Sequence, residues 1–172
     1  NAGVIVSEYR HQRSVDSFRT WLAMIRARTL DGLGPMPEVL DGRRFERLAE
    51  GVPHQMFSEL AVVNGFFEGL LGLQVDVPTR RIELAPRLPP TWDTLKVNRI
   101  PCGPGALNLR LRRSRSDYRL FFDLNWSGGA QVDLAPELPA GSQLVSVSLD
   151  GKAVASEVEQ LPASTRVRLN LR

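Results

Sequence analysis

The hydrophobic pattern changes its period near residue 75, and this change constrains the fold more than any other feature of the sequence. Upstream, apolar residues recur every three or four positions, which is the spacing of an amphipathic helix. Downstream, apolar and polar residues alternate in short runs between turn residues, which is typical of half-buried strands. The sequence therefore predicts an α+β chain in two parts. These are a helical segment over residues 1–75 and an antiparallel β-sandwich over residues 76–172.

Two helices are expected in the first part. The first covers residues 8–30, where one face collects the apolar residues Val15, Phe18, Trp21, Leu22, Ile25 and Leu30. It should stop near residues 31–35, because glycine and proline in this stretch terminate helices.

The second helix should begin near Pro53 or His54 and end near Gly72. Its apolar residues spread almost all the way round, which indicates a helix buried on most sides. Gly65 and Gly69 lie inside it, and each costs about 1 kcal/mol relative to alanine. They predict the close approach of a neighbouring helix, or an end to the first part of the helix at Gly65.

Six strands are expected in the second part, at residues 95–100, 106–112, 118–124, 131–134, 144–149 and 166–171. Asp150-Gly151 is a good hairpin turn, and residues 114–117 are a second turn. Gly103-Pro104-Gly105 is a turn between strands rather than a phosphate loop.

Composition excludes several functional classes. The 172 residues carry a net charge of only +3, and no apolar run reaches the length of a membrane span. Arg110, Arg112, Arg113 and Arg115 form a basic stretch without interleaved aromatic residues, so a solvated strand face is expected rather than a nucleic-acid site. We expect no nucleic-acid partner and no membrane contact.

Cysteine and histidine are too few for a metal site or a disulfide. Cys102 is the only cysteine, which favours a reducing compartment and hence the cytoplasm. His11 and His54 are the only histidines, and they lie in different segments. We therefore expect no metal and no cofactor.

One carboxylate stands out in the connection between the helices. Glu38 follows Pro37 in a loop of unusual length, and such loops are often functional. A glycosidase needs two carboxyl groups, one to protonate the leaving oxygen and one to activate water or attack the sugar. On residue type alone, a merely solvated glutamate is the commoner outcome.

Three short motifs in order carry a resemblance to a known family. Residues 34–42 (GPMPEVLDG), 52–59 (VPHQMFSE) and 69–73 (GLLGL) resemble the end of the catalytic domain in glycoside hydrolases of the amylo-α-1,6-glucosidase (glycogen debranching) type. Those enzymes have a six-hairpin, (α/α)6-barrel fold. Residues 81–92 also resemble the segment that follows the last barrel helix, before a terminal β-sandwich.

The resemblance implies a site and a substrate class. Glu38 falls on the general base of an inverting hydrolysis, and His54, Gln55 and Ser58 fall on the segment beside the substrate. The partner would be a carbohydrate, either an α-glucan or another glycoside. The sequence departs from the family where Met56-Phe57 replaces the usual Ala-Trp, which puts sugar stacking at that position in doubt.

The chain has room for only about one of the six hairpins. We therefore expect a C-terminal fragment of such a hydrolase, inactive alone because the general acid lies upstream. Its helices should expose an apolar face, covered by the rest of the barrel or by self-association. The alternative is a freestanding carbohydrate-binding or assembly β-sandwich module without catalysis, with Trp92, Trp126 and Tyr118 as candidate contacts.

Overall fold

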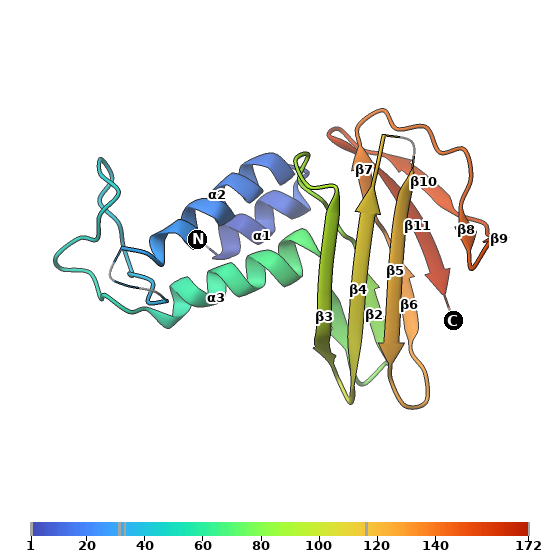
Figure 1. The fold of residues 1–172 in the computed structure, drawn as a ribbon, viewed down its shortest axis with the longest axis horizontal. Helices are drawn as coiled ribbons and strands as arrows, with labels where there is room; N and C mark the ends of the chain where they lie inside the picture. Colours follow the sequence, from blue (N-terminus) through green and yellow to red (C-terminus); the bar gives the residue numbers. More distant parts are fainter. Residues whose placement is uncertain (1, 31, 33, 116, 172) are drawn as a thin grey trace. The chain divides into compact units, whose positions relative to one another are not determined.

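The computed structural model of the chain describes residues 2–30, 32, 34–115 and 117–171. The chain belongs to the α+β class, as the sequence predicts, and divides into two compact units, Asn1–Leu70 and Leu71–Arg172. The first unit contains the helices and the second contains the strands (Figure 1).

The helical unit consists of α1 (Ala2–Arg10), α2 (Ser14–Ala27), α3 (Met56–Asn64) and the π-helical segment η1 (Gly65–Leu70). The prediction of one helix over residues 8–30 is wrong, because the chain turns at Gln12, whose φ is 65°. The buried Ser17 hydroxyl donates to the carbonyl of Ile5 at 2.7 Å, and this joins the two helices after the turn. Periodicity misses the break because both helices direct their apolar faces to one core. Asp31 and Leu33, part of the expected stop, lie outside the described residues.

Two glycines allow the helices to pack closely, which confirms the sequence prediction. A Cβ atom at Gly65 would lie 2.7 Å from Trp21 Cδ1 and 2.9 Å from Ile5 Cγ2. A Cβ atom at Gly69 would lie 2.6 Å from Tyr9 Cδ2. Because these neighbouring side chains are buried, they have little room to move aside.

The α-helix changes to a π-helix at Gly65, so the helical path continues beyond this glycine. Just before the junction, Trp21 Nε1 donates to the carbonyl of Val62 at 2.8 Å. Phe66 stacks on Trp21 with ring centroids 5.9 Å apart. Single π-helical turns are rare in proteins, and those that occur often lie at functional sites.

Four large apolar residues in the first two turns of α3 are exposed, whereas the sequence predicts a helix buried on most sides. Met56, Phe57, Leu60 and Val63 are 61%, 70%, 41% and 48% exposed. Residues 56, 60 and 63 follow helical spacing, so they lie on one face. Part of the all-round apolar pattern of α3 therefore forms an exposed apolar surface in this structure.

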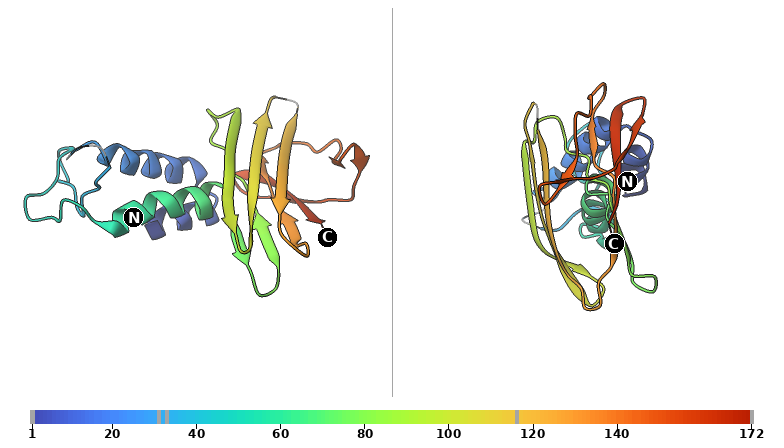
Figure 2. Two further views of the ribbon diagram at one scale, coloured as in Figure 1. Left: turned by 60° about the horizontal axis from the view of Figure 1, so that its bottom comes forward. Right: turned by 90° about the vertical axis from the view of Figure 1, so that its right-hand side faces the viewer.

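The strands of the second unit are β1 (Gln74–Asp76), β2 (Arg81–Leu84), β3 (Thr94–Cys102), β4 (Gly105–Arg113), β5 (Tyr118–Asn125), β6 (Gln131–Leu134), β7 (Glu137–Pro139), β8 (Ser148–Leu149), β9 (Lys152–Ala153), β10 (Glu157–Gln160) and β11 (Ser164–Leu171). One sheet has the order β1-β2-β6-β11-β10, with β7 also paired to β11. A second sheet has the order β3-β4-β5, and its strands lie side by side in Figure 1 and in the left view of Figure 2. A third is the β8–β9 hairpin.

Five of the six expected strands occur near their predicted positions. The prediction for residues 144–149 is wrong except at Ser148–Leu149, where the short hairpin begins. Its turn has φ of 50° at Asp150 and 78° at Gly151, as the Asp-Gly signal indicates.

One strand pair departs from the antiparallel expectation. Among the described strands, β2 and β6 alone pair in parallel, with Ile82 opposite Val132. The chain between them forms the whole β3-β4-β5 sheet, and parallel neighbours need a long connection of this kind.

Alternation along β4 is confirmed. Leu107, Leu109 and Leu111 are at most 2% exposed, whereas Arg110 and Arg112 are exposed. The apolar face of this sheet is therefore in the core of the second unit, and its other face meets solvent.

Arg113 is not part of the solvated basic face that the sequence predicts. Its guanidinium donates to four carbonyl oxygens at 2.9–3.4 Å, those of Leu88, Pro89, Pro90 and Trp92. Proline lacks an N–H, so this segment has few donors of its own to pair with its carbonyls. The planar fork of arginine supplies the missing donors.

A buried ion cluster joins the strand segments around β7. Glu137 Oε1 lies 3.0 Å from Arg87 Nε and 2.7 Å from Arg166 Nη2, and its side chain is only 5% exposed. The Ser164 hydroxyl donates to Glu137 Oε2 at 3.2 Å. Burial opposes ionisation of Glu137, but the two guanidinium groups outweigh it and hold the pKa of the carboxyl below its ordinary value.

Candidate functional site

Glu38 lies in a loop whose two ends are hydrogen-bonded to each other. The Glu38 N–H donates to the carbonyl of Val52 at 2.9 Å, and the Val52 N–H donates to Glu38 Oε2 at 3.3 Å. Among the described residues, Oε1 of Glu38 accepts no hydrogen bond, and the residue is exposed. One oxygen of the carboxylate is therefore anchored and the other faces solvent.

The start of α3 is attached to the same loop. The Gln55 N–H donates to the carbonyl of Met36 at 2.8 Å, and the Ser58 hydroxyl donates to the carbonyl of Pro37 at 3.0 Å. These contacts bring Gln55 next to the Met36-Pro37 peptide and Ser58 next to the Pro37-Glu38 peptide. Ser58 thus positions the loop with its hydroxyl proton, and its oxygen can still accept a further hydrogen bond.

His54 pairs with a carboxylate of the helix. Its Nε2 atom lies 2.6 Å from Glu59 Oε1, and both side chains are partly exposed. His54 is therefore held at the N-terminal end of α3. No contact with Glu38 is among the interactions of the described residues.

The loop between Glu38 and Val52 is closed by its own hydrogen bonds. The Asp41 carboxylate accepts the N–H groups of Arg43 and Arg44 at 2.7 Å each. Leu40 forms an isolated antiparallel bridge with Arg47, whose guanidinium also donates to loop carbonyls. Such self-contained loops present residues on a rigid frame and are frequently functional.

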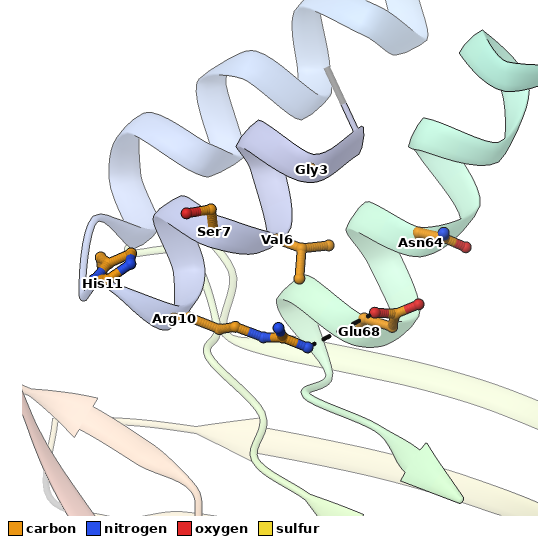
Figure 3. Close-up of a pocket in the computed structure, with 7 residues that line it drawn as sticks. All are labelled: Gly3, Val6, Ser7, Arg10, His11, Asn64 and Glu68. Carbon is orange, nitrogen blue, oxygen red and sulfur yellow. Dashed lines mark ion pairs between the residues drawn. The ribbon is translucent and has the colours of Figure 1, made fainter.

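A hollow of about 330 Å³ lies between α1 and the end of the α3–η1 stretch (Figure 3). It is lined by Gly3, Val6, Ser7, Arg10, His11, Asn64 and Glu68. Arg10 extends toward Glu68, with 4.0 Å between Nη2 and Oε2. The sequence analysis does not reveal this hollow, because it predicts a first helix that begins only at residue 8. The spacing of Ser7, Arg10 and His11 on one helical face is the signal that could have revealed it.

This hollow is distinct from the Glu38 loop. Met56 and Glu68 are at opposite ends of the α3–η1 stretch, about 18 Å apart at the rise of an α-helix. The two polar groupings of the helical unit therefore do not form one site.

The aromatic residues of the β unit are mostly unsuited to stacking on a sugar. Trp126 is buried at 7% exposure. The Tyr118 hydroxyl oxygen is also buried, and burial raises the pKa of this phenol far above its ordinary value despite the nearby Arg113. Trp92 is half-buried and lines an open hollow of about 410 Å³ formed by residues 91–96.

Other chemistries have little support in the described part of the chain. It contains no group of three or more side chains able to hold a metal ion. Cys102 is fully buried, and burial raises the pKa of its thiol, so a reactive thiolate is disfavoured. Within the described residues, no helix combines the length and apolarity that crossing a bilayer requires.

Comparisons with family models, with curated proteins and with solved structures find no match to this chain.

Proposed function

We propose that Glu38 is the general base of an inverting glycoside hydrolase of the amylo-α-1,6-glucosidase type. On this proposal the helical unit is the end of an (α/α)6 barrel and the β unit is a C-terminal β-sandwich. The substrate is an α-glucan or a related glycoside, bound with the help of His54, Gln55 and Ser58. The lone, buried Cys102 thiol is the ground on which we propose a cytoplasmic location.

The observation that carries the proposal is the way the loop holds Glu38. A general base must keep one oxygen free for water while its position is fixed. The Val52 N–H anchors Oε2, and the Ser58 hydroxyl holds the preceding peptide. These contacts join residues 34–42 to residues 52–59, two of the three motif segments that carry the resemblance.

The test uses the natural gene product that contains this chain, with isomaltose and maltotriose as substrates. Glu38→Gln is expected to lower kcat by about 10²–10⁴-fold with little change in KM, because it removes only proton transfer. The anomer first released, followed by NMR, should be inverted. The 172-residue chain alone should be inactive, because the partner acid is proposed to lie outside it.

Glu50→Gln is the matched control, because Glu50 is an exposed carboxylate in the same loop. It should leave kcat unchanged. Full activity of Glu38→Gln, or release of the retained anomer, would contradict the assignment of Glu38 as a base.

The exposed face of α3 supports the proposal that further barrel helices cover the helical unit. Without them, Met56, Phe57, Leu60 and Val63 offer an apolar surface for self-association. We expect the 172-residue chain to form dimers or larger species at micromolar concentration in sedimentation velocity. Phe57→Lys with Leu60→Lys should shift it to the monomer.

Val145→Lys is the control for this experiment, because Val145 is 96% exposed in the β unit. It changes charge and hydrophobicity without touching α3, so the oligomers should persist. A wild-type chain that stays monomeric would contradict the prediction that the exposed apolar face of α3 must be buried against another helix.

A further inference from the structure

The outward face of the β3-β4-β5 sheet carries an array of cations that the proposed function does not use. We define this basic face as Lys96, Arg110, Arg112, Arg119 and Phe121. The strand register aligns them in two rows: Arg112 lies opposite both Thr94 and Arg119, and Arg110 lies opposite both Lys96 and Phe121.

Like charges therefore face each other across neighbouring strands. Lys96 is opposite Arg110, and Arg112 is opposite Arg119. Neighbouring strands are about 4.8 Å apart, and like charges directly opposite each other destabilise a sheet. A bound polyanion would relieve this repulsion. Without a ligand, the arrangement of like charges contributes nothing to the stability of the fold.

The carboxylates nearby neutralise only part of the array. Asp117 pairs with Arg119. Among the described residues, no carboxylate forms an ion pair with Lys96, Arg110 or Arg112. Three cations on adjacent strands are thus left to meet an anionic ligand.

One of these cations is already positioned. The guanidinium of Arg110 lies over the Phe121 ring, with its Cζ atom 4.6 Å from the ring centroid. This contact restrains the side chain and leaves its donors to bind a carboxylate or sulfate group. Less conformational freedom is then lost when a ligand binds.

The geometry points to an anionic polysaccharide, with carboxylate or sulfate groups along its chain, as the ligand of the basic face. Single-stranded nucleic acid binds through open aromatic rings that stack on bases, and Arg110 covers the one aromatic ring of this face. A three-stranded sheet is also wider than the two-stranded ribbon that the DNA major groove admits. This site is separate from the proposed hydrolase site.

The residue pair next to Arg110 and Phe121 on this face can form hydrogen bonds with sugar hydroxyl groups. Asn108 lies opposite Asp123 on the same face, and its amide donates to Asp123 Oδ2 at 3.3 Å. The Asp123 carboxylate can accept a hydrogen bond from a hydroxyl group but repels a second acid. This favours a sugar chain with spaced charges over an acidic peptide.

The experiment measures binding of the 172-residue chain to immobilised polygalacturonate, dextran sulfate, neutral dextran, oligo(dT) and poly-glutamate. We expect binding to polygalacturonate, to dextran sulfate or to both, weakened by salt, and none to neutral dextran. The first two ligands distinguish carboxylate from sulfate recognition. No binding to either of them would overturn the inference.

Arg110→Gln with Arg112→Gln should lower the affinity by about five- to twentyfold, since an exposed charge pair contributes at most about fivefold. Arg168→Gln with Lys152→Gln removes the same charge from exposed positions on other sheets of the β unit, β11 and β9, and should change the affinity by less than about twofold. An equal loss in both double variants, or equally tight binding of oligo(dT) or poly-glutamate, would overturn the inference.

Thermal unfolding shows whether the variants bind less because they fold less well. Arg112→Gln relieves the repulsion from Arg119, so its Tm should equal or exceed that of the wild type while its affinity falls. Lys96→Gln serves as a second single variant with the same expectation. A loss of affinity only in variants whose Tm also falls would overturn the assignment of a binding role to these cations.

Discussion

Replacement of Glu137 by glutamine is expected to lower the free energy of unfolding of the β unit by about 3 kcal/mol or more. The substitution keeps the shape of the side chain but removes the negative charge between Arg87 and Arg166, whose side chains are only 10% and 16% exposed. Arg87 would then lose this counter-ion, and Arg166 would keep only its pair with the more exposed Glu159. Chemical denaturation followed by the fluorescence of the buried Trp126 measures the change.

Glu159→Gln is the matched control. Glu159 pairs with the same Arg166 at 3.3 Å, but its side chain is 44% exposed. Exposed ion pairs contribute about 0–1 kcal/mol, so this variant should be almost as stable as the wild type. Equal stability of the two variants would contradict the role assigned to burial.

The same cluster makes the stability of the β unit depend on pH. Because the pKa of Glu137 is lowered in the folded state, the folded chain binds a proton less readily than the unfolded chain. The stabilisation by Glu137 is therefore complete at pH values above the pKa of the unfolded-state carboxyl, about 4.3. It is lost as the pH falls toward the lower pKa of the folded state. The difference in stability between the wild type and Glu137→Gln should shrink as the pH is lowered through this range.

Gly105→Ala is expected to destabilise the β unit by about 3 kcal/mol. A Cβ atom at this position would lie 1.6 Å from the carbonyl oxygen of Asn125, so the backbone of β4 or β5 must move. The strands are paired here, with Ala106 opposite Asn125. Hydrogen exchange should show faster opening of this end of the β4–β5 ladder, together with a lower denaturation midpoint.

Gly42→Ala is the control for this substitution. A Cβ atom at Gly42 has no neighbour within 4 Å, so stability should be unchanged or slightly raised. If Gly105→Ala unfolds at the same denaturant concentration as the wild type, the strands must adjust more easily than their register implies.

The sequence predicts some parts of the candidate sites and not others. The resemblance joined residues 34–42 and 52–59, and the hydrogen bonds of Glu38 and Ser58 lie between these segments. The hollow beside Arg10 and Glu68 was not predicted, because it depends on α1 folding back beside η1. The sequence predicts one solvated face for the basic stretch, yet Arg113 donates to carbonyl groups and only its neighbours face solvent.

The sequence by itself determined the features that depend on local spacing. The change of period near residue 75 predicted helices before strands, the alternation along β4 predicted its buried face, and Asp150-Gly151 predicted a hairpin. Each of these follows from residues a few positions apart, whose side chains share a face or a turn.

Tertiary structure alone decided the features that depend on distant partners. The break at Gln12 accompanies a bond between Ser17 and Ile5, the parallel pairing of β2 requires β6, and Glu137 is buried between arginines of two other segments. From residue type alone, Gln12 would be assigned to a helix interior, β2 to an antiparallel edge and Glu137 to the solvated surface. Only the contacts made on folding supply the partners that choose between these outcomes.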